Sequence, residues 1–260
     1  MYLIFFFVCF FASVVGAVCG IGGGVIIKPV LDALGVLDVA AVSFLSGCTV
    51  LAMTTYSVVK GKMSGESHVE TGTGIPLALG AAAGGIVGKW AFSCIVQMSS
   101  DANRVGAIQA LCLLLVTVGT LLYTLCKEKI KTLHIQNAAA CLVIGIFLGM
   151  LSSFLGIGGG PINLIVLFFF FSMGVKKAAE NSLYIILFSQ ATSLVSALLS
   201  NHVPAFSAQA LVLMVAGGIC GGICGRALNK RIAEKTVERL FVGLMLVIIL
   251  INAYNIYQYA

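Results

Sequence analysis

Charged residues are scarce in this sequence. Only 9% of the 260 residues are charged and 60% are hydrophobic, whereas a soluble domain carries about 25% charged residues. Five uncharged stretches reach or exceed the roughly 20 residues that cross a hydrocarbon core, at 1–27, 39–59, 105 up to Lys127, 135–175 and 181–225. Two further apolar segments lie at 73–97 and 240–257. The sequence therefore predicts an all-α integral membrane protein without a soluble domain.

The first apolar run lacks features of a secretory signal. It has no basic n-region and continues into a glycine run without a cleavage site, so we expect it to remain in the mature protein. The net charge of +6 comes from basic residues spread over short loops. Such residues set the orientation in the membrane and contact anionic lipid headgroups. We expect membrane lipid as a partner and no nucleic acid.

Clusters of metal-binding or catalytic residues are also lacking. The nine cysteines fall in or at the ends of apolar segments without a CxxC pair, and His68, His134 and His202 lie in predicted loops. This pattern argues against a zinc site and against the residues of an intramembrane hydrolase. We expect no metal, no cofactor, no catalytic residue and no enzyme activity. One alternative stays open, a relay for reduced sulfur through the thiol of Cys19 or Cys48.

Ionisable side chains are nearly absent from the predicted spans. All nine acidic residues lie at segment ends or in loops, whereas cation pumps and proton-coupled carriers keep a carboxylate within the membrane. Lys89 and Arg226 are the only cations expected within the spans. They either extend to the headgroups or contribute to a path for anions.

The sequence contains a duplicate of itself. The pentapeptide GIGGG occurs at 20–24 and again at 156–160, a displacement of 136 positions. Rows of glycines spaced by four recur at a displacement of 137, and they indicate close helix packing: Gly80, Gly84 and Gly88, then Gly217, Gly221 and Gly225. We predict two transmembrane repeats, 1–130 and 131–260, as in many secondary transporters.

Each glycine run is predicted to be the tip of a hairpin. Residues 135–175 are too long for one span and too short for two full spans with a loop. We therefore expect a long helix to enter the membrane in each half and a short helix, at about 24–35 or 161–173, to return to the same side. With three further spans per half, the second half is inverted. This topology puts twelve of the fifteen lysines and arginines on one side and three on the other, against ten and five for parallel repeats. The positive-inside rule favours the inverted topology, with loop 226–239 cytoplasmic and both termini outside.

The two glycine tips are the candidate binding site. Glycine lets successive N–H groups converge on one point, and a helix that begins there adds the positive end of its dipole. The candidate anion-binding glycines are Gly22, Gly23, Gly24, Gly158, Gly159 and Gly160. The alternative is that these glycines serve only tight turns and packing.

Neutral polar residues near the tips complete the candidate site. Hydroxyl and amide groups donate hydrogen bonds to an oxyanion without the cost of a buried charge. The candidates are Ser43, Ser46, Thr49, Pro161, Asn163, Asn181, Ser182 and Gln190. The alternative is that such side chains bond to helix carbonyls or across helices.

The doubled glycine motif resembles the sulfite exporter TauE/SafE family, also called the TSUP transporters. The resemblance covers essentially the whole chain and rests on 20–29, Gly35 and 40–43 in the first half, and on 156–160, Gly174, Ala178, Ala179, Asn181 and Ser182 in the second. The second half departs from the family pattern at Ile165, where a proline is expected, and Val42 and Asn181 replace a threonine.

The resemblance implies a secondary transporter for a small sulfur-containing anion such as sulfite, thiosulfate, sulfoacetate or another sulfonate. We expect a plasma-membrane carrier that works by alternating access and binds its anion between the tips. A carboxylate carrier and a passive subunit of a larger complex remain as alternatives. The oligomeric state stays open, with a homodimer as one candidate.

Overall fold

The computed structural model describes residues 2–65, 71–98, 102–200 and 203–259, and these ranges contain helices and no strand. The elements in chain order are α1 (Tyr2–Cys19), α2 (Gly24–Leu34), α3 (Val39–Met63), α4 (Thr71–Met98), α5 (Ala102–Cys126), η1 (Lys127–Lys129), α6 (Ala138–Leu155), α7 (Gly160–Phe171), α8 (Val175–Leu199), α9 (Ala208–Arg231) and α10 (Glu234–Tyr259). Within the described part, seven helices are long and apolar enough to cross a membrane: α3, α4, α5, α6, α8, α9 and α10. The predicted all-α integral membrane fold is confirmed.

Two hairpins replace simple spans at the glycine runs. Each hairpin reverses at backbone conformations with positive φ, which only glycine adopts at low cost. The φ angles are 82° at Gly22 and 66° at Gly23 in the first hairpin, and 83° at Gly158 and 85° at Gly159 in the second. The short helices that follow, α2 and α7, have 11 and 12 residues. They match the short returning helices that the sequence predicts.

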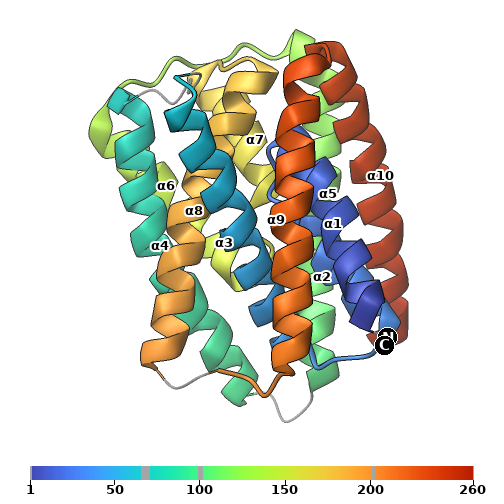
Figure 1. Cartoon of the computed structure of the whole chain (residues 1–260). Coiled ribbons are helices and arrows are strands. Elements are labelled where there is room, and N and C mark those ends of the chain that lie inside the picture. Colours follow the sequence, from blue (N-terminus) through green and yellow to red (C-terminus); the bar gives the residue numbers. More distant parts are fainter. Residues whose placement is uncertain (1, 66–70, 99–101, 201–202, 260) are drawn as a thin grey trace.

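The hairpins enter the bundle from opposite ends. Figure 1 shows both termini at one end, from which α1 rises into the bundle and to which α2 returns, while α6 and α7 enter from the other end. The second half therefore runs inverted relative to the first. The predicted boundary between the repeats, at 130/131, falls in the connection between η1 and α6, and the division into two repeats stays a prediction.

The glycine rows join the two halves. Gly80, Gly84 and Gly88 of α4 lie against main-chain carbonyls of α6, and a Cβ at any of them would collide with that backbone. In the same way, Gly217, Gly221 and Gly225 of α9 lie against carbonyls of α1. The predicted close packing is confirmed. Each half thus uses its long glycine-rich helix to hold the hairpin of the other half.

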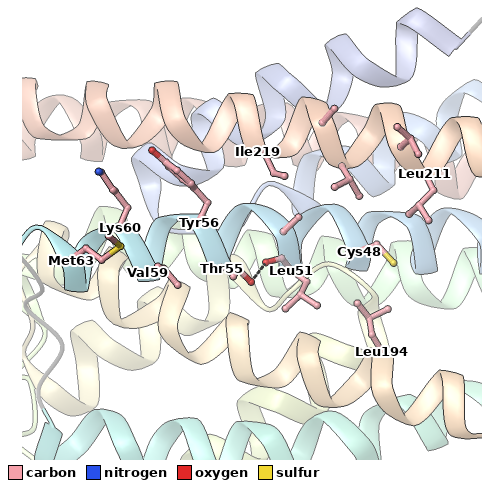
Figure 2. Close-up of a pocket in the computed structure, with 14 residues that line it drawn as sticks. Cys48, Leu51, Thr55, Tyr56, Val59, Lys60, Met63, Leu194, Leu211 and Ile219 are labelled. Atoms are coloured by element: carbon pink, nitrogen blue, oxygen red, sulfur yellow. Dashed lines mark hydrogen bonds between the residues drawn. The ribbon is translucent and has the colours of Figure 1, made fainter.

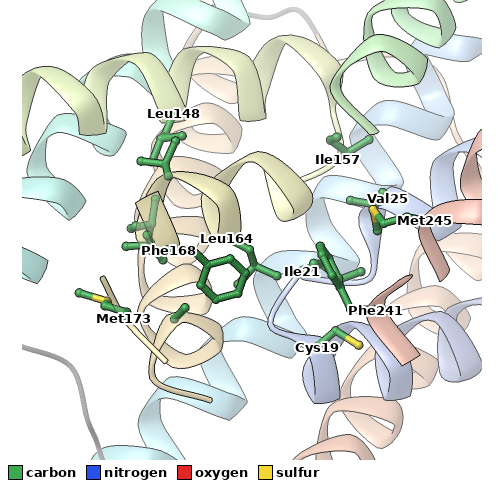
Figure 3. Packing of buried hydrophobic residues seen from close by; sticks show 14 of the residues in the cluster. Cys19, Ile21, Val25, Leu148, Ile157, Leu164, Phe168, Met173, Phe241 and Met245 are labelled. Atoms are coloured by element: carbon green, nitrogen blue, oxygen red, sulfur yellow. The ribbon is translucent and has the colours of Figure 1, made fainter. Parts of the chain in front are cut away.

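Apolar side chains anchor the tips in the core. Ile21 and Ile157, the isoleucines within the two GIGGG runs, are both fully buried. Figure 3 shows them in one cluster with Leu164 of α7 and Phe241 of α10. Close contacts of this kind hold each tip in place through dispersion.

An ion pair lies inside α2, which corrects the expectation that Lys89 and Arg226 are the only cations within the spans. Lys28 Nζ lies 2.7 Å from Asp32 Oδ2, and the two side chains are 3% and 6% exposed. Their spacing of four residues places them on one helix face. The sequence pattern did not indicate this burial, because α2 is short and its burial depends on the helices around it, including α10, whose Asn255 donates to the Pro29 carbonyl.

Candidate functional site

The two glycine tips touch each other inside the bundle. Gly24, the first residue of α2, lies against the carbonyl oxygen of Ile157, and Gly160, the first residue of α7, lies against that of Ile21. A Cβ at either glycine would collide with this backbone. All six candidate glycines are buried, so the structure brings this part of the predicted site together.

The helices that begin at the tips have no side-chain cap. Their N-cap residues are Gly23 and Gly159, which provide no side-chain hydrogen bond. The first N–H groups of a helix need partners from outside the helix, and its N-terminus carries roughly half a positive charge. Each tip therefore lies at the positive end of a helix dipole.

Two apolar side chains lie directly on the tips. A Cβ at Gly22 would lie 3.0 Å from Ile186 Cδ1 and 3.4 Å from Val50 Cγ1, and one at Gly158 would lie 3.0 Å from Val50 Cγ1 and 3.2 Å from Ile186 Cγ2. Val50 of α3 and Ile186 of α8 stand 136 positions apart, the displacement of the glycine runs. The pair covers both tips in this conformation.

Asn163 in the first turn of α7 is the most unusual polar residue here. It is 0% exposed, and neither Nδ2 nor Oδ1 hydrogen-bonds to a described protein group. A Cβ at Gly159 would lie 3.0 Å from Oδ1 and 3.1 Å from Nδ2, so the amide borders the second tip. An unsatisfied buried polar group costs about 1–3 kcal/mol. The corresponding residue of the first half is Ile27, which makes the second tip the more polar one.

A chain of hydrogen bonds continues from the second tip. Ser152 Oγ lies 3.3 Å from Ser189 Oγ, and Gln190 Nε2 donates to Ser152 Oγ over 3.4 Å. The Cβ of Ser152 also borders Gly159. Ser152 and Asn163 thus both border Gly159, and Ser152 also accepts a hydrogen bond from the candidate Gln190. Ser152 is not among the candidates predicted from the sequence, although its place one turn before the glycine run is a usable signal.

Three candidate serines line the inner faces of α3 and α8. Ser43, Ser46 and Ser182 are buried, and none of their hydroxyls has a hydrogen-bond partner within the described residues. Ser43 borders Gly156 at the second tip, where a Cβ would lie 3.0 Å from its Oγ. Helical spacing places the first two on the face of Val50 and the third on that of Ile186.

Three other candidates, Thr49, Asn181 and Pro161, have local roles within their own helices. The Thr49 hydroxyl donates to the Leu45 carbonyl over 2.9 Å, and its methyl group borders Gly218 of α9. Asn181 Nδ2 donates to the Lys177 carbonyl over 2.9 Å. Both follow the alternative in which a polar side chain bonds to its own helix. Pro161 is buried in the first turn of α7, where the missing N–H is not needed.

An apolar groove forms a cavity separate from the tips. It has a volume of about 1020 Å³ and lies between α3, α8 and α9. Figure 2 shows Cys48, Leu194 and Leu211 toward one end and Lys60 near the other. An anion gains little from a hydrocarbon lining, whereas lipid chains match it.

Potential metal ligands do not gather in the described residues, where no group of three or more His, Cys, Asp or Glu could hold an ion. The cysteines in those ranges are free. The candidate site thus consists of glycine backbone, amides and hydroxyls.

The comparison with protein families agrees with this arrangement. The profile of the family described as Sulfite exporter TauE/SafE matches residues 5–251. Neither the curated proteins nor the solved structures include a significant match. The match covers both hairpins and nearly the whole bundle, and the chain therefore belongs to the sulfite exporter TauE/SafE family.

Proposed function

We propose that this protein is a secondary carrier that binds a small sulfur-containing oxyanion between its glycine tips. The buried, unpaired amide of Asn163 beside the uncapped start of α7 carries the proposal. Sulfite, thiosulfate and sulfonates each present several acceptor oxygens. The amide nitrogen, the hydroxyls and the first N–H groups of α7 are donors that match those oxygens.

The site suits release as well as binding. The polar groups around the second tip are neutral, and Lys28, the buried cation of α2, is paired with Asp32. An oxyanion would thus be held by dipoles without a full counter-charge. Such binding is strong enough for selection and weak enough for turnover, which a carrier requires.

The inverted hairpins support alternating access. Val50 and Ile186 cover the tips from α3 and α8, two helices that contact each other. A rocking movement of these helices relative to the hairpins would uncover the tips from one side and then from the other, as in other inverted-repeat carriers. We propose that a solute gradient drives this movement.

The basic end of the bundle gives the orientation. The C-terminal ends of α3 and α9, the N-terminal ends of α8 and α10, and η1 with its connection to α6 lie opposite the chain termini (Figure 1). Together they carry twelve of the fifteen lysines and arginines. We propose that this end faces the cytoplasm of a plasma membrane and that both termini lie outside.

A thiol relay has less support. Cys19 is 1% exposed and packs within the apolar cluster, and Cys48 lies in the wall of the apolar groove. Neither thiol hydrogen-bonds to Asn163, whose amide has no hydrogen-bond partner among the described residues. We therefore propose a carrier rather than an enzyme.

Sulfite flux into proteoliposomes tests the function. Asn163→Leu replaces the amide by an apolar side chain of similar size, so we expect flux to fall at least about tenfold, the loss of roughly one charge-assisted hydrogen bond. Asn252→Leu is the matched control, because Asn252 is also buried but bonds to the Ile248 carbonyl of its own helix. Wild-type flux in Asn163→Leu would refute the proposed site. Absence of saturable flux of sulfite, thiosulfate and sulfonates in the wild type would refute the function.

A further inference from the structure

A polar cavity lies beside the first glycine turn, at the predicted cytoplasmic end. It has a volume of about 290 Å³ and is formed by α1, α3, α8 and α9. Its polar groups come from Ser57, Lys176, Glu180, Arg226, Asn229 and Lys230. Three cations face one carboxylate, so the cavity has a positive potential.

The cavity borders the first hairpin, because Ala17 of α1 lines it. Ala179, which lines the cavity, lies against Gly20, and a Cβ at Gly20 would collide with Ala179. Gly20 begins the turn that carries Ile21, whose carbonyl touches Gly160 of the second tip. Ala179 thus contacts the glycine turn and also lines the cavity.

Arg226 is held in the cavity wall. Its Nη1 donates to the Ser57 carbonyl of α3 over 2.9 Å. The guanidinium also lies against Gly61, where a Cβ would approach Nη1 to 3.1 Å. An arginine that extends to the lipid headgroups would point along its helix toward the end of the bundle. Arg226 instead crosses to the neighbouring helix α3 and lines the cavity.

A second cavity lies at the opposite end of α8. It has a volume of about 330 Å³ and is lined by Lys89 of α4 and Ser196 of α8, and Lys89 stands at a displacement of 137 from Arg226. Lys89 Nζ lies 5.0 Å from the centre of the Phe92 ring. At 1.5 Å per residue, the 20 residues from Lys176 to Ser196 separate the two cavities by about 30 Å along α8. The two cavities therefore lie at opposite ends of the bundle.

We propose that the two cavities are anion-binding vestibules at the two mouths of the transport path. The capturing cations are Lys176 and Lys230, beside Arg226, at one mouth and Lys89 at the other. The proposal rests on the proposed function and extends it to sites outside the tips. Both volumes are at the lower limit of pockets for small organic ligands, about 300 Å³, which suits a partly hydrated oxyanion. Positive potential in a narrow mouth raises the local concentration of anions and their rate of association.

The vestibules act on capture and not on the transport step. Removing their charge should raise KM for sulfite and leave the maximal rate unchanged, because the interactions at the tips remain. The effect should be confined to one face of the membrane for each vestibule. It should also weaken as ionic strength rises, since salt screens charges beyond about 10 Å at 0.1 M.

Sided flux measurements test the vestibules. In inside-out and right-side-out vesicles, Lys176→Gln/Lys230→Gln should raise KM for sulfite about tenfold from the face with Arg226 and leave KM from the other face unchanged. Lys89→Gln should do the reverse. The matched control is Lys177→Gln, a neighbouring lysine that does not line the cavity, and Lys176→Arg/Lys230→Arg should keep the wild-type KM.

The outcomes separate this proposal from the proposed function. A wild type without saturable anion flux overturns both. Saturable wild-type flux with unchanged KM in both charge-neutralised variants overturns the vestibules alone. An equal rise in KM with Lys177→Gln would also overturn them, because the effect would then come from general surface charge.

Discussion

Lys28 and Asp32 form a buried ion pair in α2, while the equivalent positions of α7 hold Leu164 and Phe168. The same fold therefore uses a charged pair in one half and two apolar side chains in the other. Burying two charges is costly, and their attraction offsets that cost only while both are present. The apolar pair in α7 shows that this helix position does not require charge.

A single variant and a double variant test the energetics of this pair. Lys28→Met leaves the Asp32 carboxylate buried without its partner, so we expect a loss of about 3–5 kcal/mol in unfolding free energy. Lys28→Leu/Asp32→Phe, which copies α7, should regain most of that loss. The measurement is chemical unfolding in detergent. A double variant as unstable as Lys28→Met would show that α2 needs the charges themselves.

The second prediction concerns the apolar pair on the tips. Val50→Phe places a larger side chain where Val50 Cγ1 already lies 3.0 Å from the Cβ position at Gly158, and overpacking of this kind costs about 1–3 kcal/mol. We expect sulfite flux to fall at least about tenfold, because the tips can no longer be uncovered. Leu51→Phe, one residue along, faces the apolar groove and should keep its flux. Equal flux in both variants would contradict a covering role for Val50.

The third prediction separates two classes of glycine. Gly160→Ala introduces a Cβ 2.6 Å from the Ile21 carbonyl oxygen, a distance that forces the tips apart. We expect loss of flux and a lower unfolding temperature. Gly119→Ala in α5 meets no atom within 4 Å and should raise helix stability by up to about 1 kcal/mol. Thermal unfolding of the two purified variants, compared with wild type, should give shifts of opposite sign.

The hairpins and their inverted arrangement could be predicted from the sequence, because glycine runs and span lengths are local signals. Asn163 could also be predicted from the sequence, because a polar residue just after a glycine run stands out in an apolar segment. Val50 and Ile186 could not be predicted, because an apolar side chain in an apolar helix gives no signal until the surface it contacts is known. The burial of Lys28 likewise depends on the position of α2 among its neighbours, which no local pattern encodes.

The roles of Thr49 and Asn181 show a further limit. Their residue types predict donors near the tips, but Thr49 Oγ1 and Asn181 Nδ2 donate to carbonyls of their own helices. A hydroxyl or amide in a helix has such a carbonyl within reach four residues earlier. Whether it uses that carbonyl depends on the neighbours that the fold supplies.

The last prediction concerns orientation. The termini and the connection at 203–207 lie at one end of the bundle, and the connection at 130–137 lies at the other (Figure 1). Because the second end carries most of the basic residues, the positive-inside rule places it in the cytoplasm. An epitope added at either terminus or at 203–207 should be stained in intact cells. An epitope at 130–137 should be stained only after permeabilisation. Staining of the termini without staining at 203–207 would contradict the inverted topology, whereas staining of 130–137 alone would keep that topology and reverse the orientation.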